Sequence, residues 1–303
     1  KALTMNHPDL FRKIYSDINE KLIVLEDKPE EDVESTIKAL WLAAAGINTS
    51  VVKATQLTLP ELTAEQIRKL YELVDLRLKN VPLAHLTNRQ DFMGIEFIVD
   101  NRALIPRKET EILAKKAIGI ISEESKAKDL LKVFDVCCGS GNLGISIAFY
   151  NQKCKVYSSD ISSEAVELTR ENIKTQNLEG KVTVSESDLF SAFESDSFYH
   201  TTDLIVCNPP YISTSKVEKM NPEIASFEPS LAFDGGSFGF KIIQRLINDS
   251  PKFLKKDGWL LFEVGVGQGE FVTKMIDKTN LYQSVNAEKD KSGNIRVIIA
   301  QAK

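Results

Sequence analysis

The chain is poor in cysteine, and its cysteines lack the spacing of zinc ligands or of an obvious disulfide. Four cysteines occur among 303 residues: Cys137, Cys138, Cys154 and Cys207. Cys137 and Cys138 are direct neighbours, which is poor geometry for a disulfide, and no paired C-x-x-C motif is present. We therefore predict buried free thiols in a reducing compartment, and no metal site.

Long apolar segments and an excess of basic residues are also missing. The longest apolar run, residues 39–47, is far shorter than the roughly 20 residues that cross a bilayer. Residues 1–9 are mixed and polar, unlike a signal peptide. The net charge of −5 argues against a protein that binds nucleic acid mainly by neutralising phosphates. We expect a cytoplasmic protein with no membrane segment and no direct nucleic-acid binding.

Residues 1–86 contain helical patterns and no convincing strand. Apolar residues recur at helical spacing in residues 10–25, 33–44 and 67–78. Thr63 and Gln66 fit a capping box ahead of the third run. These features predict a small helical bundle.

Residues 87–104 change character and predict a β-hairpin that links two domains. Phe92, Ile95, Phe97 and Val99 have strand-like spacing, and Gly94 lies in the expected turn. We expect the helical domain to end at residue 86, before the hairpin, and a second domain to occupy residues 105–303.

Residues 105–303 alternate between expected strands and expected helices. Pro106 is expected to begin a helix that has Glu109 and Glu111 in its first turn. The segment 212–239 has no clear periodicity and predicts an active-site loop or lid. The pattern as a whole predicts an α/β fold with a doubly wound, mostly parallel sheet and an antiparallel edge hairpin. Strands are expected at residues 130–138, 154–160, 182–184, 203–207, 258–264, 282–286 and 295–299, and helices at 145–150, from 160 to 173, and 239–253.

The expected strand at residues 203–207 runs directly into Asn208-Pro-Pro-Tyr211. Neither proline can donate a ladder hydrogen bond, so the strand ends there, and the residue before a proline is held extended. In open α/β sheets, ligands bind outside the carboxyl ends of the strands. The Asn208 side-chain carbonyl and the Pro209 backbone carbonyl are two acceptors that can hold both hydrogens of a planar NH2 group. Tyr211 can cover the flat face of the substrate.

The motif itself contains no His, Cys or Lys, so the substrate nitrogen is predicted to be the nucleophile. Two fixed acceptors would stabilise the positive charge that grows on this nitrogen during attack. The alternative interpretation is a proline-rich loop in which Asn208 only begins a turn. The other motifs of the chain favour the catalytic interpretation.

A glycine-rich turn follows the expected strand at residues 130–138. Gly139, Gly141 and Gly144 let backbone amides approach a ligand before a helix begins. Asp160 ends the next expected strand about twenty residues later, a spacing that suits a carboxylate on ribose hydroxyls. The turn lacks the G-x-G-x-x-G spacing of dinucleotide sites.

A second acidic residue follows the third expected strand. Asp188 can accept a hydrogen bond from an adenine amino group, and Leu189 can pack on the adenine ring. The alternative for Asp188 is a helix cap.

Taken together, these motifs resemble a class I methyltransferase that uses S-adenosyl-L-methionine and acts on an amino or amide nitrogen. The resemblance extends to the HemK/PrmC family of protein glutamine methyltransferases and covers nearly the whole chain. Its most specific part is Ile105-Pro-Arg-Lys-Glu-Thr-Glu111 ahead of Asn208-Pro-Pro-Tyr211. Further segments that carry it are Leu73-Val-Asp-Leu-Arg77, Val81-Pro-Leu-Ala-His85, Asp91-Phe-Met-Gly94, residues 135–141, Asp160-Ile-Ser, Ser187-Asp-Leu-Phe190, Phe227-Glu-Pro229, Gly235-Gly236 and Gly293-Asn-Ile-Arg-Val297.

The resemblance implies a fold, a substrate and a set of site residues. The fold is the seven-stranded class I methyltransferase sheet, and the product of the cofactor is S-adenosyl-L-homocysteine. The substrate is the glutamine side-chain amide in the Gly-Gly-Gln motif of peptide-chain release factors, which the helical domain would help to grip. The implied catalytic residues are Asn208, Pro209, Pro210 and Tyr211, and the implied cofactor-binding residues are Phe92, Thr110, Asp135, Cys137, Cys138, Gly139, Ser140, Gly141, Asp160, Ile161, Asp188, Leu189 and Asn208.

The chain departs from the family pattern at Cys137, where the family usually has glycine, and at Asn88 and Lys108. Three other functions stay open at this point. They are methylation of a ribosomal-protein glutamine, methylation of an exocyclic amine of adenine or guanine after base flipping, and binding of a release factor or ribosome without catalysis.

Overall fold

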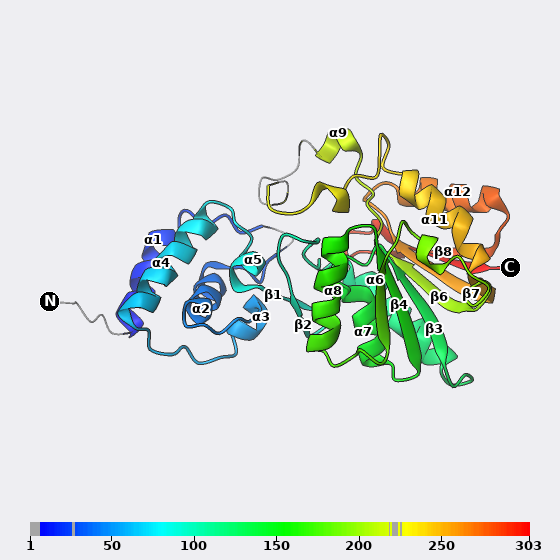
Figure 1. The fold of residues 1–303 in the computed structure, drawn as a ribbon. Coiled ribbons are helices and arrows are strands. Elements are labelled where there is room, and N and C mark those ends of the chain that lie inside the picture. Colours follow the sequence, from blue (N-terminus) through cyan, green and yellow to red (C-terminus); the bar gives the residue numbers. More distant parts are fainter. Residues whose placement is uncertain (1–6, 26–27, 218, 220–223, 225) are drawn as a thin grey trace. The chain divides into compact units, whose positions relative to one another are not determined.

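The computed structural model describes residues 7–25, 28–217, 219, 224 and 226–303. The chain divides into two compact units. The first comprises residues 1–101 and 221–227, and the second comprises residues 102–220 and 228–303. Figure 1 shows both units and labels many of their helices and strands. No helix in the described residues has the length and apolar character needed to cross a membrane.

The first unit is a helical bundle with one hairpin. Trp41 and Leu40 of the second helix lie in its core with Ile14 of the first helix and Leu70 of the fourth. Both hydrogen bonds of the predicted capping box, between Thr63 and Gln66, are present. The helices are α1 (His7–Ile18), α2 (Val33–Ala44), α3 (Val51–Ala54), α4 (Ala64–Leu78) and α5 (Leu83–Thr87).

The first helix is shorter than its apolar pattern predicts. It ends at Ile18, so Leu22 and Leu25 lie beyond it. Asn19 follows the last helical residue, and asparagine favours helix ends because its side chain competes for backbone hydrogen bonds. The expectation of one helix through Leu25 was wrong.

The predicted hairpin consists of β1 (Arg89–Phe92) and β2 (Ile95–Ile98), paired antiparallel. Met93 and Gly94 form its turn with positive φ values of 56° and 76°, as a two-residue hairpin turn requires. The Glu96 carboxylate accepts hydrogen bonds from the Thr49 hydroxyl and the Ser50 amide, each at 2.7 Å, at the start of α3. These bonds explain why the hairpin groups with the first compact unit, which reaches Asn101.

The second unit is built on a seven-stranded sheet, which confirms the predicted fold class. The strand order is β5-β4-β3-β6-β7-β9-β8. Neighbours from β5 to β7 are parallel, and β9 is antiparallel to both β7 and β8. The strands are β3 (Leu131–Val136), β4 (Cys154–Asp160), β5 (Val182–Glu186), β6 (Thr202–Cys207), β7 (Leu254–Glu263), β8 (Tyr282–Lys289) and β9 (Ile295–Ala302).

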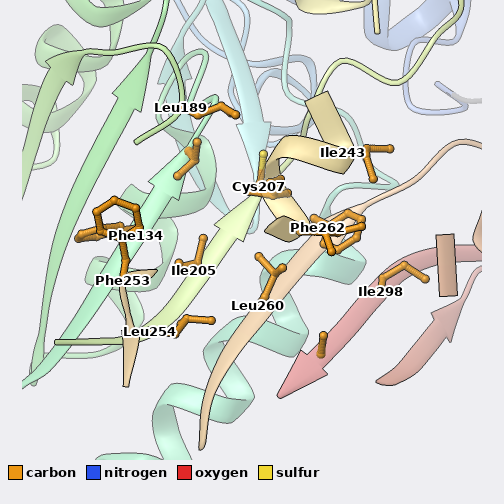
Figure 2. Close-up of a cluster of buried hydrophobic side chains, with 14 of the residues drawn as sticks. Phe134, Leu189, Ile205, Cys207, Ile243, Phe253, Leu254, Leu260, Phe262 and Ile298 are labelled. Carbon is orange, nitrogen blue, oxygen red and sulfur yellow. The ribbon is translucent and has the colours of Figure 1, made fainter. Parts of the chain in front are cut away.

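The helices of this unit cover both faces of the sheet. The cluster in Figure 2 joins Phe134, Ile205 and Phe262 of three neighbouring strands to Ile243 of α11. Side chains alternate between the two faces of a strand. Asp135, the neighbour of Phe134 in β3, therefore faces the opposite side of the sheet, where α7 packs. The helices are α6 (Glu111–Glu124), α7 (Asn142–Tyr150), α8 (Ser163–Thr175), α9 (Thr214–Val217), α11 (Lys241–Asp249) and α12 (Gly269–Thr279), with 3₁₀ turns η1 (Ser191–Phe193), η2 (Ser230–Ala232) and η3 (Ser250–Lys252).

Three expected helix limits in this unit were wrong. Pro106 does not begin α6, which starts at Glu111 after Thr110. Asp160 does not begin α8, because Ser162 is the N-cap residue and its hydroxyl accepts from the Ala165 amide. The helix expected at residues 239–253 is divided into α11 and η3, since Pro251 cannot continue the α-helical hydrogen bonds.

Candidate active site

A cavity lies at the carboxyl ends of β3, β4, β5 and β6. The chain adds β4 and β5 on one side of β3 and then places β6 on the other side. Such a reversal of strand order is where open α/β sheets bind ligands. The lining residues include Cys137, Cys138, Gly139 and Ser140 after β3, Asp160 and Ile161 of β4 and its loop, Ser187, Asp188 and Leu189 after β5, Asn208 and Pro210 after β6, and Arg107 and Thr110 ahead of α6.

The loop between β3 and α7 follows a backbone path with several left-handed residues. Cys137, Gly139 and Gly141 have φ values of 58°, 56° and 81°. A Cβ on Gly141 would lie 2.8 Å from the Thr169 methyl carbon, so only glycine fits there without movement. Cys137 has a left-handed backbone conformation that glycine adopts more readily than a residue with a side chain.

Two side chains of α8 hold this loop in place. The Thr169 hydroxyl donates to the Gly139 carbonyl at 2.8 Å, and the Asn172 amide donates to the Ser140 carbonyl at 3.0 Å. Both side chains are fully buried. Neither residue was predicted from the sequence to be part of the site, although their spacing of three residues on a predicted helix places them on one helix face.

Asp160, the last residue of β4, is hydrogen-bonded to the loop that follows β3. Its carboxylate accepts from the Gly139 amide at 2.9 Å and from the Ser162 amide at 3.0 Å, through different oxygens. Burial raises the pKa of Asp160, while these backbone hydrogen bonds oppose the rise. Each oxygen keeps a further lone pair, so the carboxylate can accept from two ligand hydroxyls.

Asp135 lies behind the loop and does not line the cavity. One carboxylate oxygen accepts from the Gly144 amide at 2.9 Å in the first turn of α7. The other oxygen is buried and has no hydrogen-bond partner in the described residues. Burial raises the pKa of Asp135 to about 7, and the nearby charge of Asp160 adds to the rise.

The end of β5 presents Asp188 and Leu189 to the cavity. Leu189 has a φ of 52° and is buried, so its backbone turns sharply at this point. The Asp188 carboxylate pairs with both terminal nitrogens of Arg245, at 2.9 and 3.1 Å. Asp188 is therefore held by an ion pair from α11, and it is not a helix cap. The exposed side chain of Ile161 adds apolar surface to the cavity.

The chain after β6 is tied to β7 through one buried carboxylate. The Asn208 side-chain NH2 donates to the Thr110 hydroxyl oxygen at 3.4 Å, and the Thr110 hydroxyl donates to Glu263 at 2.6 Å. The Tyr211 hydroxyl donates to the other oxygen of Glu263 at 3.0 Å, and Arg296 donates to that same oxygen at 3.3 Å. Hydrogen bonds therefore hold both Asn208 and Tyr211, the first and last residues of the predicted motif.

Arg107 and Glu228 form a second buried pair beside the cavity. The Arg107 guanidinium donates to Glu228, whose other carboxylate oxygen accepts from the Ile105 amide at 2.8 Å. The second terminal nitrogen of Arg107 is buried and has no hydrogen-bond partner among the described residues. The pair joins two motifs noted in the sequence, the segment at residues 105–111 and Phe227-Glu-Pro229.

The cavity brings most of the predicted site residues together. Asp135, Gly141, Pro209 and Tyr211 are not among the residues that line it. Phe92 belongs to the first compact unit, where it packs against Phe97. The roles assigned to all of these residues stay predictions. The residues on the cavity wall are Thr110, Cys137, Cys138, Gly139, Ser140, Asp160, Ile161, Asp188, Leu189, Asn208 and Pro210.

The fold and this cavity indicate a methyltransferase, and comparisons with known proteins agree. Residues 120–225 match the family model of the methyltransferase small domain. Among solved structures, the hMettl16 catalytic domain in complex with the MAT2A 3′UTR hairpin 6 has a TM-score of 0.55 at 15% identity, covering 76% of this chain and 81% of that chain. Human methyltransferase 10 domain containing protein has a TM-score of 0.51 at 15% identity, covering 76% and 96%. The second unit therefore has a methyltransferase fold.

Curated relatives narrow the class to one family. The release factor glutamine methyltransferase of Geobacter sulfurreducens is 31% identical over 270 residues, 89% of this chain and 90% of the relative. That of Clostridium acetobutylicum is 31% identical over 241 residues, covering 79% and 82%, and that of Rhodopirellula baltica is 34% identical over 230 residues, covering 76% and 77%. The chain belongs to the release factor glutamine methyltransferase family, which confirms the family predicted from its motifs.

Proposed function

We propose that this protein transfers a methyl group from S-adenosyl-L-methionine to the glutamine side-chain nitrogen in the Gly-Gly-Gln motif of peptide-chain release factors, in the cytoplasm. The observation that carries the proposal is the position of Asn208-Pro-Pro-Tyr211. It follows β6 directly, and Asn208 and Pro210 share one cavity with the glycine-rich loop after β3. The names of the family's curated members support the same substrate.

The residues of the cavity fit this cofactor. The Asp160 carboxylate has lone pairs left for the two ribose hydroxyls. Asp188 and Leu189 suit the adenine edge and ring, and the exposed Ile161 adds apolar surface to the cavity. The left-handed backbone at Gly139 leaves room for the methionine end to approach the loop. Bound there, the cofactor would supply a methyl group activated by a positively charged sulfur.

The chain's own contribution is to position and desolvate the substrate amide. An amide nitrogen is a poor nucleophile because its lone pair is delocalised into the carbonyl. The Asn208 side-chain oxygen and the Pro209 carbonyl would accept the two N–H groups and favour a pyramidal nitrogen whose lone pair points at the methyl group. Positioning and fixed dipoles then lower the barrier without a strong base, as the N–C bond forms and the S–C bond breaks. The methylated nitrogen is cationic and therefore acidic, so it loses its extra proton to water.

Transfer of label from S-adenosyl-L-methionine to a purified release factor tests the proposal. We expect label in the wild-type factor and none in a factor whose Gly-Gly-Gln glutamine is changed to alanine. Label in a ribosomal protein or a naked oligonucleotide, with none in the release factor, would overturn the proposed substrate.

The Asn208→Ala enzyme tests the role of the motif. We expect it to lose turnover while calorimetry still detects S-adenosyl-L-homocysteine binding, because Asp160 and the glycine-rich loop are unchanged. Full activity of this variant would exclude the proposed mechanism.

A further inference from the structure

Glu263 is a buried glutamate next to the proposed catalytic motif but outside the cavity wall. It is the last residue of β7, and Cys207 of β6 pairs with Phe262, so Glu263 lies beside Asn208 in the register of the sheet. Its exposed fraction is 2%. Burial raises the pKa of Glu263, and hydrogen bonds from Thr110 and Tyr211 and the charge of Arg296 oppose that rise.

The number of protons on each group sets the direction of the hydrogen bonds that link Glu263, Thr110 and Asn208. An ionised carboxylate only accepts, and a threonine hydroxyl has a single proton to donate. The Thr110 hydroxyl lies 2.6 Å from Glu263, so it gives its proton to the carboxylate. Its oxygen then offers only lone pairs to Asn208, 3.4 Å away. Asn208 must therefore turn its NH2 toward Thr110, and its carbonyl oxygen points elsewhere.

We propose that Glu263 is a positioning residue that, through Thr110, fixes which way the Asn208 side-chain amide faces and so presents its carbonyl oxygen to the substrate. This inference rests on the proposed function and extends it. The two ends of an asparagine side chain have nearly the same shape, so packing alone cannot select one of them. If the amide turned over, a donor would face the substrate NH2, which needs acceptors.

Arg296 and Tyr211 donate hydrogen bonds to the Glu263 carboxylate and favour its ionised form, which opposes the effect of burial. Arg296 donates to Glu263 at 3.3 Å and also to the Val264 carbonyl at 3.3 Å, so the guanidinium is fixed between two acceptors. Tyr211 donates to the same carboxylate oxygen as Arg296, which leaves the other oxygen for Thr110. The Tyr211 side chain is thereby held in place by the group that orients Asn208.

Substitutions that keep shape but change proton direction test the proposal. In Glu263→Gln the new NH2 can donate to Thr110, whose proton is then free to point at Asn208 and favour the reversed amide. In Thr110→Val the acceptor for the Asn208 NH2 is lost. We expect each change to lower kcat by on the order of 10- to 100-fold. Glu263 does not line the cavity, so Glu263→Gln should leave S-adenosyl-L-homocysteine affinity little changed. Thr110→Ser should restore kcat, because it keeps the hydroxyl.

The double variant distinguishes orientation of Asn208 from general support of the fold. Both substitutions interrupt one chain of hydrogen bonds, so Thr110→Val with Glu263→Gln should lower kcat no more than the worse single variant. Glu288→Gln removes another glutamate of the same sheet, one paired with Lys116 on the surface, and should leave kcat unchanged. Multiplicative losses, or a fall in the thermal midpoint with an unchanged kcat, would refute the proposal.

A measurement without substrate separates this proposal from the proposed function. The side-chain NH2 resonances of Asn208, identified by their absence in Asn208→Ala, should shift in Thr110→Val and in Glu263→Gln but not in Glu288→Gln. If Glu263→Gln does not fold, Thr110→Val against Thr110→Ser decides. An inactive wild-type enzyme would contradict the release-factor substrate, whereas unchanged Asn208 resonances would contradict the orienting role of Glu263 whatever the substrate is.

Discussion

The unfolding free energy of this protein should fall with rising pH because of one buried carboxyl, Asp135. Its pKa is raised from 3.8 to about 7, with burial as the main cause. A pKa that is higher in the folded state means that the folded state binds the proton more tightly. The resulting stability is fully present below pH 4, and it is lost as the pH rises through about 7.

The size of the effect follows from the shift. Between pH 5 and pH 7 the unfolded chain has released the proton and the folded chain retains it, so the unfolding free energy falls by about 1.4 kcal/mol per pH unit. From pH 5 to pH 8 the loss should be on the order of 3 kcal/mol. This is a large part of the stability of an ordinary domain.

Asp135→Asn is the matched variant for this prediction. Its amide keeps an oxygen to accept from the Gly144 amide and cannot titrate. We expect urea unfolding curves at pH 5, 6, 7 and 8 to show wild type losing stability relative to the variant across this range. Groups present in both proteins, including Asp160, largely cancel in the difference. Parallel pH dependence of the two proteins would show that Asp135 is ionised in the folded state, and would refute the burial argument.

Three further substitutions test contacts around the cavity. Gly141→Ala adds a Cβ against α8 at a φ of 81°, and should lower the unfolding free energy in urea by about 1–3 kcal/mol. Glu228→Ala leaves the buried guanidinium of Arg107 without its carboxylate, and should cost about 3–5 kcal/mol in the same assay. Arg245→Ala removes an exposed partner of Asp188, so stability should change by less than about 1 kcal/mol, while calorimetry should show several-fold weaker S-adenosyl-L-homocysteine binding. Unchanged stability of the first two variants, or unchanged affinity of the third, would contradict the corresponding contact.

Strand limits were predicted well where a local physical cause sets them. The strand expected at residues 154–160 is β4 with the same limits. The strand ahead of the two prolines ends at Cys207, as expected, because neither proline can donate to the ladder. A short apolar run and the turn residues beside it set where such a strand begins and ends, and both lie within a few residues of each other in the sequence.

Helix starts were predicted less well because tertiary contacts decide how a capping side chain is used. Asp160 has a residue type and position that suit a helix cap, yet its carboxylate binds the Gly139 amide of another loop. Ser162 then caps α8 in its place. The alternatives differ by about 1 kcal/mol locally, less than the contacts that the sheet imposes.

The sequence by itself determined the class of fold, the order of its elements and many of the residues that line the cavity at the strand ends. Strand alternation, glycine and proline positions and polar residues at strand ends are local features, and they can be read in a single chain. Only the tertiary structure decided the pairings behind that cavity. Thr110 reaches Glu263 across 153 residues, and Arg107 reaches Glu228 across 121. A hydrogen bond between two distant single residues creates no periodic pattern, so it becomes visible only when the sheet brings their strand ends side by side.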